Sequence, residues 1–441
     1  MIRRNIFFAV AFLSAVFAFS QEMESENSVA TEESAEIVAE TEEESKKIGE
    51  ITFSGLKKTN EKYLRRVLKD FEGKDANEEN LKALENALQK EQLFEEIKVN
   101  ADTSGETVSL SISLKEKISF LPLPFGAVSN GNAMFGLFVM DTNAFGVRDS
   151  FVFGGLYSAS SMMGFAMYSK HAVDITHPGF TLSASSSKST TTISDEAEND
   201  VFEYDHKGFG AGLTISEKLG KYVSVNAGCS YSYMNSDEAD DEYAAWDDTF
   251  FGIDRIQTIT PHFSVGIGAT DWNGVFLSQK SIGFGGSLLF TDFFDGETWQ
   301  KAQTASAKLV LQQPLFSPKF RLMSAAAAFW SHDAAITAWQ GGSAVNVSIL
   351  ASNFVSKRLA GGNAGFEWAF ATSKIGTFSA YGLYECAWAQ NFAEDIVFAH
   401  GPEGGMKLYL SKIAIPALNF GMAYNAVEKF WNTTFAFGVQ F

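Results

Sequence analysis

Large and small side chains alternate along the last twelve positions of the chain. Every second residue from Trp431 to Phe441 is large and mostly apolar, whereas the residues between them are small or polar. A period of two indicates a β-strand. One lipid-like face beside one small polar face is typical of a strand in a transmembrane barrel. An edge strand of a soluble sandwich would alternate in the same way, so the rest of the chain must decide.

The same alternation, interrupted by polar turns, repeats along the chain after residue 125. Its clearest case is Tyr222 to Tyr233, where aliphatic and aromatic residues alternate with Ser, Asn and Gly. At roughly ten residues per spanning strand, region 118–441 accommodates about sixteen antiparallel strands. The predicted fold is therefore an all-β outer-membrane barrel.

The ends of this barrel are also predicted. Pro122 and Pro124 indicate a stiff linker over 118–125. The first strand is expected at about Ala133–Met140 and the last at Trp431–Phe441, and these two strands would form the seam of the barrel. Acidic segments between strands, expected to be loops on the cell-surface side, are Asp195 to Asp200, Asp237 to Asp248 and Asp292 to Glu297.

Residues 48–117 follow a different pattern. A short strand at Ile48–Phe53 is followed by a helical face that includes Tyr63 and Leu64, with Thr59 as its candidate N-cap. A second helix is predicted from about Asn77 to Lys90. Two alternating strands then close the segment, so the order β-α-α-β-β predicts a small α+β domain.

The N-terminus carries targeting signals. Arg3 and Arg4, the apolar run after them and the small residues at 18–20 predict a signal peptide over residues 1–20. Residues 21–47 are rich in Glu and Ser, a composition that cannot bury a core and predicts a disordered acidic linker. No later stretch is long and apolar enough for a membrane-spanning helix.

Composition narrows the function classes. The net charge of −19 argues against a nucleic-acid partner, because phosphates require Lys and Arg. The two cysteines, Cys229 and Cys386, lie in strand-like runs on the apolar face and are expected to be unpaired. The six histidines show no metal-ligand spacing, and no nucleophile elbow is present. We therefore expect no enzyme activity, no cofactor and no metal site.

The small domain resembles a POTRA (polypeptide-transport-associated) domain. The residues that carry the resemblance are Phe53, Gly55, Thr59, the helical pair, Leu93, Phe94 and Glu116. The resemblance implies a periplasmic domain that receives extended polypeptides at the edge of its sheet. One such domain is present, over 48–117.

The barrel resembles the BamA/TamA-like outer-membrane assembly and transport superfamily, also called the bacterial surface antigen family. The matching segments, in the order in which that family has them, are Asp141 to Ser150, His177 to Phe180, Asp271 to Phe276 with Ser281 to Leu289, and Gly341 to Ser343. A terminal Phe is part of the assembly signal in such barrels. The resemblance therefore assigns that signal to Phe435, Phe437, Gly438 and Phe441.

One departure from the family lies in the loop that folds into the lumen. In the family, the glycines are followed by an Arg-Gly motif whose Arg pairs with a lumen carboxylate. Here Gly341 and Gly342 are followed by a segment that includes Asn346 and has no Arg-Gly. Glu385 has the parity of an inward residue, so it is the candidate carboxylate, and Arg358 is its candidate replacement partner.

The resemblance implies a role in the insertion of barrel proteins into the outer membrane or in polypeptide translocation across it. The implied partners are outer-membrane lipid, unfolded or nascent outer-membrane polypeptides, and periplasmic chaperones or accessory lipoproteins. Two alternatives stay open: a dedicated two-partner-type exporter, and a degenerate relative that acts as a passive pore or structural surface antigen. The missing Arg-Gly motif favours the last of these.

Overall fold

The computed structural model describes the chain from residue 46 to residue 437 with short gaps. The described ranges are 46–129, 132–158, 161–172, 177–220, 222–236, 255–272, 275–294, 299–334, 338–351, 353–391, 394–410 and 418–437. The predicted signal peptide, nearly all of the predicted acidic linker and the acidic segment at 237–248 lie outside these ranges. No described helix has the length and apolarity needed to cross a bilayer.

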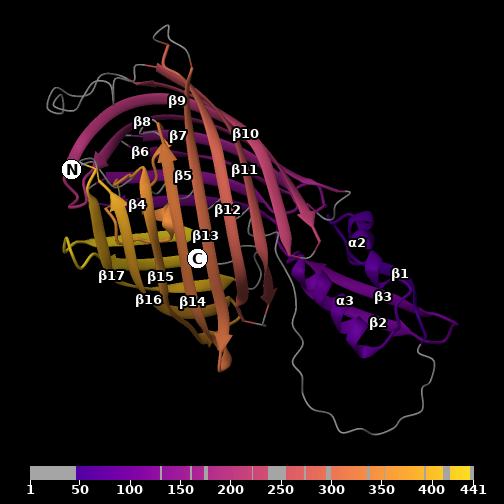
Figure 1. The fold of residues 1–441 in the computed structure, drawn as a ribbon. Helices are drawn as coiled ribbons and strands as arrows, with labels where there is room; N and C mark the ends of the chain where they lie inside the picture. The colour runs from indigo at the N-terminus through magenta and orange to yellow at the C-terminus, as the bar shows by residue number, and fades with distance from the viewer. Residues whose placement is uncertain are drawn as a thin grey trace.

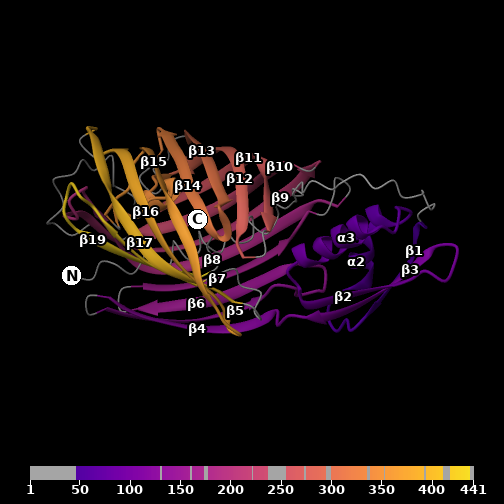
Figure 2. The same ribbon diagram turned by 90° about the horizontal axis from the view of Figure 1, so that it is seen from below.

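The small N-terminal domain has the predicted β-α-α-β-β order (Figures 1 and 2). Its three-stranded sheet has the order β1-β3-β2, with β1 parallel and β2 antiparallel to β3. Apolar residues of both helices, such as Leu64 and Leu84, pack with alternate strand residues such as Leu110 and Ile112 in one core. The elements are β1 (Ile48–Ser54), α2 (Glu61–Val67), a 3₁₀ turn η1 (Lys69–Phe71), α3 (Glu78–Lys90), β2 (Phe94–Asp102) and β3 (Val108–Glu116).

Helix starts in this domain follow side-chain capping. The side chain of Asn77 accepts the N–H of Asn80 at the start of α3. The N-cap of α2 is Asn60, whose side chain accepts the N–H of Lys62, so the prediction of Thr59 as the cap was wrong by one residue. Thr59 is instead buried at the boundary with the barrel.

The described residues after this domain form one 16-stranded antiparallel sheet in sequence order from β4 to β19, as predicted (Figure 1). The first eight strands are β4 (Phe120–Ser129), β5 (Asn132–Asp141), β6 (Ser150–Ser158), β7 (Ser161–Lys170), β8 (Gly179–Ser194), β9 (Asp200–Leu219), β10 (Val223–Ser236) and β11 (Arg255–Trp272). The last eight are β12 (Leu277–Asp292), β13 (Gln300–Leu315), β14 (Ser317–His332), β15 (Arg358–Thr372), β16 (Gly376–Gln390), β17 (Ile396–Leu410), β18 (Leu418–Tyr424) and β19 (Trp431–Phe437).

The barrel begins one strand earlier than the sequence indicated. Residues Phe120–Ser129 are strand β4, and Pro122 and Pro124 pair with Val139 and Leu137 of β5. The expected linker at 118–125 and the expected first strand at Ala133–Met140 were therefore wrong. Proline is accepted here because β4 ends the sheet, and an edge strand needs backbone donors on only one side.

Outward residues of the strands are apolar, as lipid contact requires. Phe209 and Leu213 of β9 and Phe263 of β11 are about half exposed, whereas Met323 of β14 on the inner face is buried. Cys229 is a free thiol on the exposed face of β10.

We call the end of the barrel that contacts the small domain the domain-side end, and the opposite end the distal end. The acidic segments that begin at Asp195 and Asp292 lie at the distal end.

Candidate functional site: the barrel lumen and the domain junction

The distal connection between β14 and β15 folds into the lumen. It begins with a bridge between Gln340 and Ser356 and contains a 3₁₀ turn, η4 (Gly342–Val345). Its apolar side chains are almost fully buried against inward alanines of β14, β16, β17 and β18. We call residues 338–357 the inward loop. The loop residues in this cluster are Val345, Val347, Ile349, Leu350, Ala351 and Phe354.

Polar wall residues bind the backbone of the inward loop. The Glu385 carboxylate accepts the N–H of Ser348 at 2.7 Å and of Ile349 at 3.1 Å. Asn363 donates its amide to the carbonyl of Asn346 at 2.7 Å. Buried backbone N–H and C=O groups need hydrogen-bond partners. These contacts replace the hydrogen bonds that the loop backbone would otherwise make with water.

Two asparagines from the last strands complete this attachment. Asn432 of β19 donates to the carbonyls of Ser348 at 2.8 Å and Leu350 at 2.6 Å. Asn425, after β18, donates to the carbonyl of Ile349 at 3.0 Å. The loop is thereby linked to the last strands of the sheet as well as to β15 and β16.

The predicted loop residues lie where this attachment is made. Gly342 accepts the N–H of Val347 across the 3₁₀ turn. Asn346 caps that turn in the left-handed conformation, with φ of 58°, which Asn tolerates better than most residues. Gly341 precedes the turn in an extended conformation.

The proposed partner of Glu385 is not Arg358. Glu385 is 1% exposed on the inner face and receives backbone N–H groups. Arg358 opens β15 opposite Trp330, whose side chain is on the outer face, and the Arg358 side chain is exposed. Leu359, the next residue, is the inward one. Residues of opposite parity point to opposite sides of a sheet, so the pairing prediction was wrong.

A buried ionic cluster at the domain-side end of the lumen was missed by the sequence analysis. Arg321 of β14 donates from Nε and Nη2 to the Glu367 carboxylate of β15, at 2.9 and 2.6 Å. Lys407 of β17 lies 3.6 Å from the same carboxylate. All three side chains are fully buried. We call these residues, with the hydroxyl and amide partners described next, the Arg321 cluster.

Neutral side chains add further hydrogen bonds to the cluster. Tyr409 and Ser379 donate their hydroxyls to Glu367 Oε1 at 2.7 and 2.5 Å. Arg321 Nη1 donates to Gln312 at 3.0 Å. A buried charge group that is paired and hydrogen-bonded in this way is expensive to break, because removal of one partner leaves an uncompensated charge.

Phe276 covers the Arg321 cluster. It lies before β12, at the domain-side end, and is fully buried. The Arg321 guanidinium lies 4.6 Å from the centre of its ring, and its ring meets that of Tyr409 edge-on at 5.7 Å. The predicted hairpin motif that ends at Phe276 thus brings an aromatic cover onto the cluster.

A sequence signal for the cluster exists in hindsight. Arg321, Glu367 and Lys407 are each single charged residues between two outward apolar neighbours, for example Glu367 between Phe366 and Trp368. Such a charge on a barrel strand must face inward. The strand register that brings the three together could not be read from the sequence.

The small domain is attached to the barrel through the turn at 142–149, between β5 and β6. The Asn143 amide donates to the Thr59 hydroxyl at 3.0 Å, and Asn60 N–H donates to the Gly146 carbonyl at 2.7 Å. Gly146 has φ of +80°, and an added Cβ would lie 2.3 Å from the Lys58 carbonyl oxygen. Only glycine allows this close approach.

Charged groups reinforce this junction. Lys58 pairs with Asp141 at 2.5 Å, and Arg148 lies 3.5 Å from the Glu91 carboxylate. Tyr63 donates its hydroxyl to Glu91. Burial, followed by the charge of Glu91, raises the pKa of Tyr63 well above its usual value, so the hydroxyl stays protonated and remains a donor.

The POTRA-like motif residues shape the same region. Gly55 has φ of +83° and lies against the Leu114 carbonyl, and Phe53 and Phe94 pack in the domain core. Glu116 accepts the N–H of Thr59 at 2.8 Å and of Lys58 at 3.0 Å. Burial opposes its ionisation, but these backbone donors outweigh burial and lower the pKa of Glu116.

The two end strands of the 16-stranded sheet are β4 and β19. The sheet order runs from β19 to β4, and within the described residues no ladder joins these two strands. Strand β19 includes Phe435 and Phe437 of the predicted terminal signal. Gly438 and Phe441 of that signal lie outside the described residues.

Comparisons with known proteins agree with this architecture. Residues 46–117 match the POTRA family model, described as a surface antigen variable number repeat. The fold resembles that of BamA from Haemophilus ducreyi lacking POTRA domains 1–3, with a TM-score of 0.56 and 14% identity over 89% of this chain and 84% of that one. No curated protein sequence matches the chain.

CdiB provides a second structural comparison. CdiB from Escherichia coli matches with a TM-score of 0.55 and 13% identity, over 87% of this chain and 73% of that one. CdiB from Acinetobacter baumannii matches with a TM-score of 0.53 and 12% identity, over 88% and 73%. At these identities the likeness is one of fold.

Proposed function

Because this chain has the make-up of the BamA/TamA-like superfamily, one POTRA domain and a C-terminal barrel, we propose that it inserts barrel polypeptides into the outer membrane or moves polypeptides across it. The observation that carries the proposal is the 16-stranded sheet, in which no ladder joins β4 to β19 within the part of the chain that the structure describes. The small domain would then lie in the periplasm, and the distal loops at the cell surface.

A free edge in a membrane can direct the folding of a client strand. Unpaired N–H and C=O groups are costly in lipid, so addition of a strand to β4 or β19 is favourable and needs no cofactor. Strands β4 to β7 have nine or ten residues, close to the 9–11 that cross a bilayer. The β4 edge is thus about as long as one client strand.

The small domain offers a further edge. Within the described ranges β2 pairs only with β3, so its other edge could receive an extended polypeptide. The contacts of Thr59 and Asn60 with the 142–149 turn hold this domain against the barrel. A client held at β2 would be delivered beside the membrane wall.

The contents of the lumen weigh against a passive pore. The inward loop buries its apolar residues against the distal part of the wall, and the Arg321 cluster with Phe276 lies inside the barrel at the domain-side end. Both take up lumen volume that a steadily conducting pore would leave open. A protein that handles polypeptides needs such closure to keep the membrane sealed between clients.

The first test is a quantitative proteome of the outer membrane and the medium after depletion of this protein. Broad loss of barrel proteins would support assembly, and loss of one secreted protein would identify a dedicated exporter. No change in either fraction would refute both forms of the proposal.

An edge variant makes the test mechanistic. Residues 122, 124, 126 and 128 of β4 share one parity, and the first two are prolines. Val128→Pro removes one more donor from the free edge while the ladder to β5 is kept. We expect a folded barrel that fails to complement depletion, whereas Val128→Ala, which keeps the N–H, complements. Equal complementation by both would show that the β4 edge is not used.

A further inference from the structure

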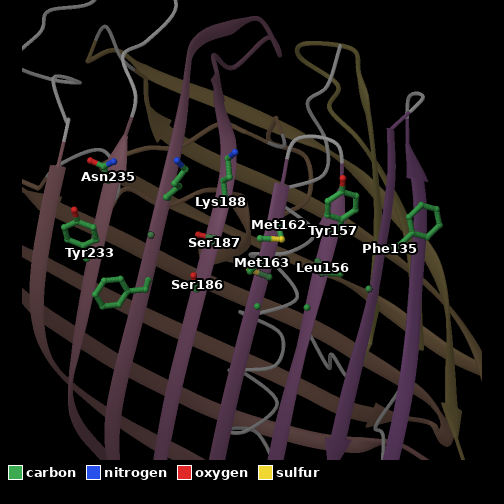
Figure 3. A pocket seen from close by; sticks show the side chains of 16 residues that line it. Phe135, Leu156, Tyr157, Met162, Met163, Ser186, Ser187, Lys188, Tyr233 and Asn235 are labelled. Carbon is green, nitrogen blue, oxygen red and sulfur yellow. The ribbon is translucent and has the colours of Figure 1, made fainter.

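The outer wall of the barrel has a hollow near its distal end (Figure 3). Its volume is about 1190 Å³, and it extends over β5 to β10. Gly155, Gly164 and Ser186 are neighbours across β6, β7 and β8 and form its floor. Side chains that border it include Phe135, Tyr157, Met162, Phe209 and Tyr233.

The floor is low because two of its three residues are glycines. Gly155 and Gly164 are on the outward face, where neighbouring positions carry Phe153 and Met162. An added Cβ at Gly164 would have its nearest neighbour at 3.9 Å, so the space above this residue is open. A groove of this kind on a lipid-facing wall accommodates an acyl chain.

Two lysines lie side by side at the distal rim of the hollow. Lys188 of β8 and Lys207 of β9 are directly opposite in the ladder, and both are exposed. Like charges placed opposite each other are destabilising unless an anion lies between them. Within the described residues, neither lysine has an ion pair.

The lysines stand at the boundary of the apolar band. Along β9 toward the distal end, the apolar outward residues Leu213 and Phe209 come first, then Lys207, and then Asp205. On β10, Tyr233 is followed outward by Asn235, which is paired with Lys207. Asp205 accepts the hydroxyl of Thr190, on the side of the lysines away from the hollow. The lysines are therefore at the level of lipid headgroups.

We propose that this hollow binds a phosphorylated membrane lipid of the distal leaflet. Its phosphate lies between Lys188 and Lys207, within reach of Asn235, and an acyl chain lies on the Gly155–Gly164 floor. Because the lysines lie at the bilayer boundary, the phosphate they bind belongs to a membrane lipid and not to a free phosphate ion. The inference rests on the membrane location of the barrel and not on its activity toward polypeptides.

The test uses the full-length protein in phosphatidylcholine nanodiscs, with lipid retention measured by native mass spectrometry. The probes are phosphatidylglycerol and bisphosphorylated lipid A, which distinguish a phosphodiester from phosphomonoester groups. The double variant Lys188→Gln/Lys207→Gln should lower retention of the preferred lipid by about tenfold or more. The control is Lys301→Gln, an exposed lysine opposite Phe290 on the outer face of β13, which should have no effect.

A second variant tests the acyl-chain floor. Gly164→Leu fills the hollow without a backbone clash and should lower lipid retention while the heat-modifiable gel shift of the folded barrel is kept. Unchanged retention in the double variant, an equal loss in Lys301→Gln, or displacement of the lipid by millimolar inorganic phosphate would each overturn the proposal. A variant that loses lipid binding but still complements depletion would separate this site from the proposed function.

Discussion

The two ends of the lumen hold a buried carboxylate in different ways. At the domain-side end, Glu367 is neutralised by Arg321 and Lys407. At the distal end, Glu385 accepts two N–H groups from the inward loop. One arrangement joins side chains of the barrel wall, and the other attaches the backbone of the inward loop to that wall. The comparison predicts that the ionic closure is harder to break than the attachment of the loop.

The largest expected effect comes from Arg321→Met. It leaves Glu367 beside Lys407 alone and removes the cation under Phe276, so we expect a loss of about 3–5 kcal/mol in the free energy of unfolding. The measurement is the temperature at which the folded band is lost on a semi-native gel. Arg358→Met, on the adjacent strand but exposed on the outer face, should change it little. Equal shifts would show that the Arg321 cluster is not a structural closure.

A smaller effect is expected at the distal end from Glu385→Ala. The part-buried N–H of Ser348 and the buried N–H of Ile349 lose their acceptor at a cost of roughly 1–3 kcal/mol. We expect loop release, seen as frequent openings in single-channel recordings, with the barrel still folded. Glu385→Gln keeps an acceptor oxygen and should open less often. A silent Glu385→Ala channel would contradict the idea of a releasable loop.

Two glycines with left-handed backbones test whether the 142–149 turn positions the small domain. Gly146 and Gly73 both have positive φ, but a Cβ would contact the Lys58 carbonyl at Gly146 and nothing at Gly73. Each Ala substitution costs roughly 1–2 kcal/mol for the left-handed backbone. Only Gly146→Ala should also broaden spin-label distances between domain and barrel. Equal broadening in both variants would argue that the turn does not position the domain.

The smallest effect is a pH dependence at Glu116. Its pKa is lowered in the folded protein, so its contribution to stability is present above the usual Glu pKa of about 4.3 and is lost as the pH falls through the lower folded value. Domain–barrel spin-label distances should therefore broaden on acidification below about pH 4. Glu116→Gln should flatten this dependence, and an unchanged profile would remove Glu116 from the junction.

Periodicity was enough to predict the barrel, and the length of region 118–441 predicted about sixteen strands. A period of two is visible in single strands such as Tyr222 to Tyr233, and a change to helical spacing marks the domain before it. It failed at β4, because Pro122 and Pro124 indicate a linker unless the strand is known to be an edge. Edge position is a property of the sheet and not of a segment.

Sequence by itself determined which face each residue of a strand takes, and so placed Glu385 on the inner face. It could not determine register or closure around the barrel, which bring Arg321, Glu367 and Lys407 together from three strands. Nor could it show that backbone N–H groups of a loop would replace a missing arginine as partners of Glu385. Parity is local, whereas the partner of a buried charge is set by residues tens of positions away, and only the tertiary structure decides it.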